Sequence, residues 1–247
     1  MSNLIEVRNV SKAFGGVVAN DNISIDVSEG QITGLIGPNG SGKTTLFNSV
    51  VGYHPIDSGS IKFKGDEISK YRVQQIARLG MLRTFQQTRI YGNMNCIDNM
   101  LISVPHRKAT FFDMFKPYPN ELRDKAEDLL DFVGLYEKRK VMSGDLSFGQ
   151  QKLLEFAMAL MNEPEVLLLD EPTAGINPTL INGLIDRLKM ANSEFGITLF
   201  IIEHNMRVIM NMADSIYCLA NGELLASGTP DEIKNDQNVI DAYLGAH

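Results

Sequence analysis

The sequence contains little cysteine, which limits the cross-links and metal sites that it can support. Its 247 residues include two cysteines, Cys96 and Cys218, and these lie far apart along the chain. Neither belongs to a CxxC pair or a Cys/His cluster, so no disulfide framework or zinc site is indicated. Because free cysteine is among the most frequently buried residue types, we interpret both as buried thiols in a reducing cytosol.

An excess of positive charge is also missing. The chain has 23 Lys and Arg residues against 30 Asp and Glu residues, which gives a formal net charge of -7. Proteins that follow a nucleic-acid backbone usually present a basic surface to its phosphates. The acidic balance therefore argues against nucleic acid as the main partner.

Long hydrophobic runs are absent as well. The N-terminal segment MSNLIEVRNV carries Glu6 and Arg8 where a signal peptide needs an unbroken apolar region, so secretion is not expected. The most apolar stretches, 166–169 and 197–202, are far shorter than the about 20 residues that span a bilayer. Any role at a membrane is therefore expected to come through a partner protein.

Alternating side chains mark the front of the chain. Residues 5–10 and 23–27 alternate between apolar and polar, which is typical of half-buried strands in an antiparallel layer. Residues 60–64 are assigned to the same layer. The pattern predicts a small N-terminal antiparallel β subdomain.

A second kind of strand predicts a parallel core. Residues 32–36, 166–169 and 197–202 are continuously apolar, as strands buried on both faces of a sheet are. Helical patterns lie between the strands, at 43–51, 146–161, 179–191 and 206–212. This alternation predicts an α/β fold with a doubly wound parallel sheet, whose chemistry gathers at the carboxyl ends of the strands.

The middle of the chain has a different character. Residues 121–133 place apolar side chains at helical spacing, and the irregular run 106–120 contains Pro117 and Pro119. We interpret 95–162 as a helical subdomain inserted into a core formed by 1–94 and 163–247. No internal repeat is present, so the chain is expected to form one unit.

A glycine-rich phosphate-binding pattern follows the first buried strand. Residues 37–45 read GPNGSGKTT, between that strand and a helix, which is the setting that gives the pattern G-x-x-x-x-G-K-[ST] its function. The glycines let successive backbone N–H groups point at phosphate oxygens, and the helix adds its positive N-terminal end. Lys43 can reach the terminal phosphates, and the Thr44 hydroxyl is a predicted ligand of Mg²⁺. The predicted nucleotide-binding residues of this phosphate loop are Gly37, Pro38, Asn39, Gly40, Ser41, Gly42, Lys43, Thr44 and Thr45.

Two acidic residues end the second buried strand. The sequence VLLLD places Asp170 at the strand's carboxyl end, where it would meet Mg²⁺ opposite Thr44. Glu171 follows directly and is free to act as the general base that polarises the attacking water. A solvated acidic strand end is the simpler alternative.

The segment LSFGQ predicts the start of a long helix. Ser147 occupies the N-cap position and Gln150 follows three residues later, which is the spacing of a capping box. By itself this segment indicates no more than a helix N-terminus.

The order of these motifs resembles that of ATP-binding cassette (ABC) ATPases. The phosphate loop, RTFQQ, LSFGQ, VLLLDE and IIEHN occur in the family's order, and the resemblance covers essentially the whole chain. It implies an ABC ATPase that binds ATP with Mg²⁺ and hydrolyses the ATP.

The resemblance also implies roles for single residues. Phe14 is expected to stack on adenine, and the less favoured alternative is a core aromatic residue that ends a strand. Gln86 is expected to sense the γ-phosphate and the transport partner, and to join Thr44 and Asp170 as a metal ligand. The neighbouring Gln87 is a weaker candidate, because Gln86 directly follows Thr84 and Phe85. The residues with implied catalytic roles are Lys43, Gln86, Glu171 and His204, the last as a γ-phosphate contact.

In this family the LSFGQ segment serves the nucleotide of a second subunit. Ser147, Gly149 and Gln150 are therefore expected to contact ATP held by a partner cassette in a head-to-tail dimer. Two positions depart from the family pattern. Phe148 replaces the first glycine of the commonest signature, and Asn177 replaces an acidic residue after Glu171.

Several stretches most resemble the Liv-type ATPases of branched-chain amino-acid importers: FGGVVAND, RTFQ, AGINP, IIEHNM and the tail SGTPDEIKNDQNVIDAYLG. This resemblance implies a sister cassette, membrane permease subunits and, indirectly, a solute-binding protein. The expected location is peripheral, on the cytoplasmic face of the inner membrane. Relatives that take up urea or short amides, or that extract lipopolysaccharide, share the AYLG ending and are alternatives.

A non-transport ABC ATPase that acts on DNA or ribosomes is the remaining alternative. Repair and chromosome-type members carry a long coiled coil between the phosphate loop and the signature, and no sustained heptads occur here. Translation-type members carry two cassettes in one chain, whereas this chain carries one. The sequence therefore favours transport.

Overall fold

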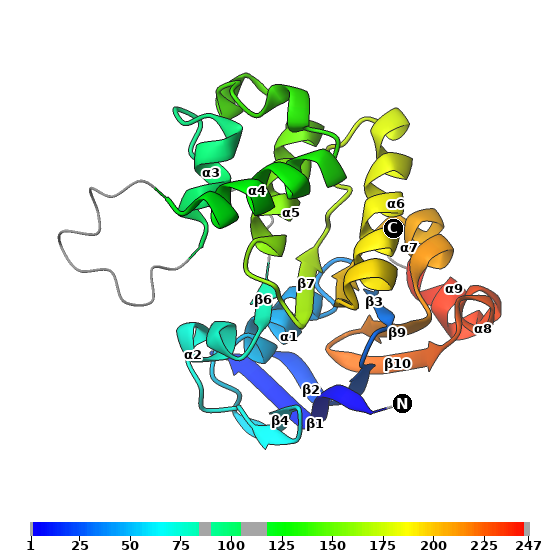
Figure 1. Cartoon of the computed structure of the whole chain (residues 1–247). Helices are drawn as coiled ribbons and strands as arrows, with labels where there is room; N and C mark the ends of the chain where they lie inside the picture. Colours follow the sequence, from blue (N-terminus) through cyan, green and yellow to red (C-terminus); the bar gives the residue numbers. More distant parts are fainter. Residues whose placement is uncertain (1, 84–89, 105–117, 245–247) are drawn as a thin grey trace. The chain divides into compact units, whose positions relative to one another are not determined.

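The computed structural model describes residues 2–83, 90–104 and 118–244 (Figure 1). The chain divides into two compact units. The first contains Met1–Arg83, Glu165–Thr173 and Leu188–His247, and the second contains Thr84–Pro164 and Ala174–Arg187. The second unit thus includes residues 174–187, which lie outside the predicted insertion 95–162.

The N-terminal part of the first unit forms an antiparallel sheet. Its strand order is β2-β1-β4-β5. The strands are β1 (Asn3–Phe14), β2 (Val17–Ser28), β4 (Ser58–Phe63) and β5 (Asp66–Glu67). The alternating segments of the sequence are therefore strands, and the predicted antiparallel subdomain is confirmed.

The second sheet of this unit is mostly parallel, with strand order β10-β9-β3-β8-β7-β6. Its strands are β3 (Ile32–Ile36), β6 (Met81–Arg83), β7 (Val166–Asp170), β8 (Thr198–Ile202), β9 (Ser215–Ala220) and β10 (Glu223–Gly228). Every residue of β3, β7 and β8 is buried, as their continuous apolar sequences predict. The α/β fold is confirmed. The sequence did not predict β6, β9 or β10, and β10 is antiparallel to β9 at one end of the sheet.

A hydrophobic core fills the space between the sheets and α1 (Lys43–Val50). Phe47 of α1 and Phe200 of β8 are fully buried, and their ring centroids lie 4.5 Å apart. Aromatic contacts of this kind add to the stabilisation from buried area. The helix that follows the phosphate loop is thereby packed against the central sheet.

The remaining helices of the first unit border the mixed sheet. They are α2 (Val73–Arg78), α7 (Met206–Met212), α8 (Pro230–Asn235) and α9 (Gln237–Leu244). The helix α6 (Pro178–Phe195) begins in the second unit and ends in the first. In the part of the chain that the structure describes, no helix is long and apolar enough to cross a membrane.

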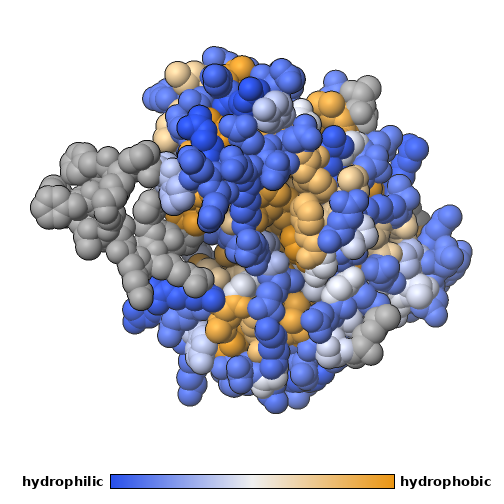
Figure 2. All heavy atoms as spheres, in the orientation of Figure 1, coloured by the Kyte–Doolittle hydropathy of each residue, from blue (hydrophilic) through white to orange (hydrophobic). Residues whose placement is uncertain are grey.

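The second unit is helical. It contains α3 (Cys96–Ile102), α4 (Asn120–Phe132), α5 (Phe148–Leu160) and short 3₁₀ turns at Tyr136–Lys138 and Ser143–Asp145. Ala126, Leu129 and Leu130 form the buried stripe of α4, and Figure 2 shows mainly hydrophilic side chains over the exposed face of that helix. The α4 segment is the helix that residues 121–133 predicted.

Replacing Phe47 with Ala is expected to lower the free energy of unfolding by about 3–5 kcal/mol, because it leaves a cavity in a closely packed core. The measurement is urea unfolding followed by circular dichroism. Met190, which is 38% exposed, provides the control: Met190→Ala should change stability by about 0.5 kcal/mol or less. Equal losses in the two variants would contradict the core assignment.

Candidate active site

The phosphate loop connects β3 to α1 in the first unit, and its glycines are required by close contacts. A Cβ atom on Gly37 would lie 2.1 Å from the Leu219 carbonyl oxygen, and one on Gly42 would lie 2.2 Å from that of Ala19. Gly42 has a φ of 97° and is the N-cap of α1, with no side chain to accept from the first N–H groups of the helix. Those donors therefore face the loop and are available to an anion.

Lys43 folds back over this loop. Its Nζ atom donates to the carbonyl oxygens of Gly37 and Pro38 at 2.8 and 2.9 Å. Burial lowers the pKa of Lys43, and the negative charges of Glu171 and Asp170 partly offset that shift. The ammonium group is thus held at the loop and near two carboxylates. From this position it could also contact a bound phosphate. Thr44 is exposed and Thr45 is partly exposed, so both hydroxyls are accessible.

Asp170 lies at the carboxyl end of β7 and is 2% exposed. Its Oδ2 atom forms an ion pair with Arg83 at 2.6 Å, whereas its Oδ1 atom is buried and has no hydrogen-bond partner. A buried charged oxygen without a partner is costly, so a ligand at this atom would stabilise the site. The sequence-predicted metal ligand therefore presents one bare oxygen.

Glu171 and His204 come together at the same edge of the sheet. The Nε2 atom of His204 lies 2.8 Å from Oε1 of Glu171, and both side chains remain partly accessible. Glu171 has a φ of 50°, and its N–H donates to the Ile202 carbonyl oxygen at 2.9 Å. A left-handed conformation in a non-glycine residue is strained and is often found at functional sites.

Phe14 is 45% exposed at the end of β1 and is not a core residue. The His54 ring meets it edge-on at a centroid distance of 5.2 Å, and Nζ of Lys12 lies 5.3 Å from the ring centroid. Asp57 holds this strand end, since its carboxylate accepts from Lys12 Nζ at 2.8 Å and from the Ala13 N–H at 2.7 Å. The Phe14 ring thus lies at the strand end, partly exposed, beside Lys12 and His54.

The LSFGQ segment lies in the second unit. Ser147 caps α5, and its backbone N–H donates to Gln150 Oε1 at 3.1 Å, so the predicted capping box is confirmed. A Cβ atom on Gly149 would lie 3.1 Å from Leu180, so a larger residue would press against α6. Phe148 is 46% exposed. Gln86 and Gln87 lie outside the described residues.

Three side chains that sequence reasoning did not single out support the site. Arg83 pairs with Asp170. In the sequence it directly precedes TFQQ, which contains the predicted site residue Gln86. Glu203 is 2% exposed and accepts from the N–H and hydroxyl of Thr173 at 3.0 and 2.5 Å. Tyr243 of α9 accepts from the Gly37 N–H at 2.8 Å. Arg83 and Tyr243 reach the site from segments distant in sequence, which no local pattern reveals, whereas Glu203 directly precedes His204.

Both cysteines are buried, as predicted. Burial raises the pKa of Cys218 to about 11 and shifts the pKa of Cys96 in the same direction. Both thiols are therefore held in the protonated form, which is a poor nucleophile and metal ligand.

Comparison with known proteins decides the family. The ABC transporter family model matches residues 20–174, which contain the phosphate loop, LSFGQ and Glu171. The chain belongs to the ABC transporter family. It is an ATP-binding cassette ATPase, and a model for the branched-chain amino acid ATP-binding cassette transporter also matches residues 223–247.

Relatives and solved structures agree over the whole cassette. LivG of Salmonella typhimurium, a high-affinity branched-chain amino acid transport ATP-binding protein, is 37% identical over 98% of both chains. BraF of Pseudomonas aeruginosa, with the same description, is 36% identical over 98% of both chains. An ATP-binding cassette of an ABC transporter, solved in its ADP conformation, matches with a TM-score of 0.89 and 32% identity, over 99% of this chain and 100% of that one.

Replacing Arg83 with Gln is expected to destabilise the cassette by up to about 3–5 kcal/mol, because it leaves the Asp170 charge buried without its partner. The measurement is the free energy of unfolding in metal-free buffer. Arg83→Lys keeps the charge and should cost less. Arg78→Gln, which removes an exposed cation at the end of α2, is the control, and a similarly small loss in Arg83→Gln would show that the ion pair contributes little.

Proposed function

We propose that this cassette binds MgATP at the phosphate loop and hydrolyses it as one half of a head-to-tail dimer that powers uptake of branched-chain amino acids. The observation that carries the proposal is the arrangement at the sheet edge. The buried Asp170 oxygen without a partner lies at the end of the strand that leads into Glu171, and Glu171 is within 2.8 Å of His204. These are the parts that metal-assisted phosphoryl transfer requires.

The phosphate loop would hold the nucleotide. Backbone N–H groups of residues 37–45 and the N-terminus of α1 would receive the phosphates, and Lys43 would exchange its contacts with Gly37 and Pro38 for phosphate oxygens. The exposed part of the Phe14 ring is proposed to stack on adenine. Gln86 is proposed to contact the γ-phosphate and the metal.

Thr44 and Asp170 fit Mg²⁺. The accessible hydroxyl of Thr44 and the bare Oδ1 of Asp170 are the oxygen donors that this ion prefers, and it usually takes its other ligands from phosphate and water. In the part of the chain that the structure describes, no group of three or more His, Cys, Asp or Glu side chains could hold a metal by itself. When bound, the ion supplies charge neutralisation at the transferred phosphoryl group.

Glu171 is proposed as the general base. His204 lies 2.8 Å from one of its carboxylate oxygens, which leaves the other oxygen to accept a proton from the attacking water. The strained backbone of Glu171 and its N–H contact with Ile202 direct this carboxylate. His204 is proposed to contact the γ-phosphate from the same edge.

The partner cassette would complete the site. Ser147, Gly149 and Gln150, at the N-terminus of α5 in the helical subdomain 95–162, are proposed to contact ATP held by the second cassette. Because the α5 N-terminus of each cassette would contact the ATP held by the other, two ATP molecules would bind at the shared interface. Binding of ATP would then favour the closed pair over the open one.

The cargo assignment follows from the relatives. LivG and BraF, which share more than a third of their residues with this chain, are ATP-binding proteins of branched-chain amino acid transport. By analogy, a sister cassette and membrane permease subunits are the proposed partners, with a solute-binding protein acting through the permeases. The cassette would lie on the cytoplasmic face of the inner membrane, held there by the permeases, and nucleic acid is not a proposed partner.

Glu171→Gln is expected to lower the ATP hydrolysis rate by about 10²–10⁴-fold, because it removes the general base. ATP should still bind and should hold the variant as a dimer in size-exclusion chromatography with Mg²⁺. Glu194→Gln alters an exposed carboxylate and serves as the control. Wild-type turnover in Glu171→Gln would overturn the assignment of the base.

A pull-down of the tagged chain from detergent-solubilised membranes tests the transport assignment. We expect two multi-spanning permeases and a second cassette to accompany it, with ATPase activity in the same fraction. Recovery with ribosomal or DNA-bound proteins instead would leave the ATPase chemistry intact and would refute the importer.

A further inference from the structure

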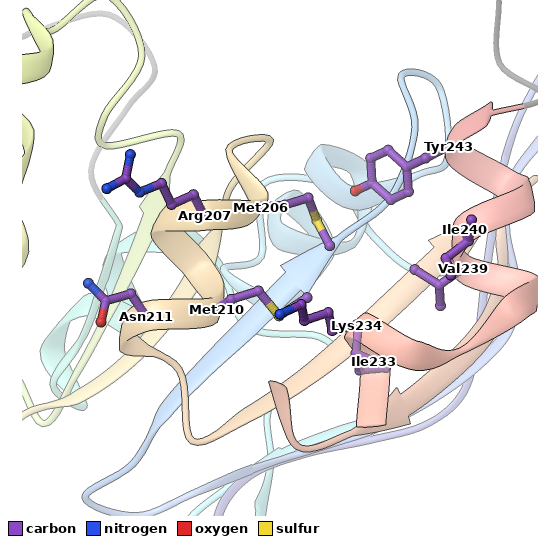
Figure 3. A pocket seen from close by; sticks show the side chains of 9 residues that line it. All are labelled: Met206, Arg207, Met210, Asn211, Ile233, Lys234, Val239, Ile240 and Tyr243. Atoms are coloured by element: carbon purple, nitrogen blue, oxygen red, sulfur yellow. The ribbon is translucent and has the colours of Figure 1, made fainter. Parts of the chain in front are cut away.

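A cavity of about 650 Å³ lies between α7 and the two C-terminal helices, α8 and α9, all in the first unit. Figure 3 shows Met206 of α7 and Tyr243 of α9 pointing toward one another across it, and Val239 of α9 also lines the cavity. The volume is within the usual range of small-molecule sites, and apolar side chains dominate the lining, as they do in such sites. Methionine adapts its shape to different apolar ligands.

Both walls of the cavity connect directly to the nucleotide site. On one wall, α7 begins two residues after His204, and the side chain of Asn205 caps the helix. On the other wall, the hydroxyl of Tyr243 accepts from the N–H of Gly37, the first glycine of the phosphate loop. A ligand that moves the Tyr243 ring would therefore disturb the contact with Gly37.

The charges at the cavity indicate what it would bind. Its ionisable cationic lining residues are Arg207 and Lys234, in a chain of net charge -7. Both are exposed, and no ion pair to either occurs within the described residues. Lys234 comes from α8 and Met210 from α7, and both line the cavity (Figure 3). Because no acidic side chain is among the described lining residues, an amino acid's ammonium group would have no charged acceptor, whereas a carboxylate would have a cation.

We propose that this cavity binds an aliphatic carboxylate, with its chain against Met206 and Val239 and its anionic end at Lys234, and that occupancy weakens nucleotide binding through Tyr243. The second half rests on the proposed nucleotide site, whereas binding in the cavity does not. The two parts can therefore fail separately.

Octanoate is the probe for the binding step, measured by isothermal titration calorimetry on the full chain without nucleotide. Lys234→Gln should weaken binding about tenfold, since it removes a charge-assisted contact. Lys70→Gln, which removes an exposed cation elsewhere, should leave it unchanged. Octylamine, with the same chain and the opposite charge, should bind at least about tenfold more weakly than octanoate. The site assignment is overturned if octanoate does not bind, or if it binds equally well to wild type and Lys234→Gln.

The coupling step is measured as the dissociation constant of a fluorescent ATP analogue with and without octanoate. Saturating octanoate should weaken nucleotide binding at least about fivefold in the wild type, and nucleotide should weaken octanoate binding by the same factor. In Tyr243→Phe, octanoate should still bind but should no longer change nucleotide affinity.

Tyr217→Phe is the matched control, because the Tyr217 hydroxyl likewise accepts a backbone N–H, that of Asp26 at 3.1 Å. This variant should retain the wild-type coupling. If Tyr243→Phe retains it too, or if octanoate leaves wild-type nucleotide affinity unchanged, the coupling is refuted. If the analogue does not bind to the wild type at all, the proposed nucleotide site fails and the coupling fails with it, whereas the octanoate result stands independently.

Discussion

The burial of the Asp170 charge is the constraint on which the site depends. A carboxylate at the end of a fully buried strand is unfavourable unless a partner compensates for the lost hydration. Arg83, from the neighbouring strand β6, is that partner, and it pairs with only one of the two Asp170 carboxylate oxygens, Oδ2. The other oxygen, Oδ1, has no hydrogen-bond partner. Lys43 lies close enough for the negative charge of Asp170 to act on the pKa of its ammonium group. The sheet thus keeps the Asp170 carboxylate buried away from water with one oxygen unpaired. This arrangement favours the binding of a cation.

A second buried carboxylate organises the residues around the first. Glu203 follows β8 and accepts hydrogen bonds from the backbone N–H groups of Thr173, His204 and Asn205. These contacts join the segment after Glu171 to the segment that carries His204. The 2.8 Å approach of Glu171 to His204 is therefore supported on both sides by backbone contacts, and the positions of the reacting groups depend little on exposed side chains.

Much of this arrangement could be predicted from sequence because the signals were local. The continuous apolar runs identified β3, β7 and β8, and the capping-box spacing identified the start of α5 at Ser147. The partners of those motifs could not be predicted, because they depend on register between distant strands. Leu168 lies opposite Arg83 only through the pairing of β6 with β7, and Tyr243 reaches Gly37 only once α9 packs near the sheet. The strand β10 was missed because its residues are mostly exposed, so it shows neither clear alternation nor a continuous apolar run.

The position of β3 has a consequence for the synthesis of the chain. It pairs on one side with β8 and on the other with β9, and both lie more than 160 residues later, as with Ile32 and Leu199. The strand that carries the phosphate loop therefore emerges from the ribosome long before either neighbour exists. Pairings between distant segments form slowly, and an unpaired apolar strand is prone to aggregate. During translation, ITGLI must remain shielded by the antiparallel sheet, by α1 or by a chaperone until the last third of the protein has been made.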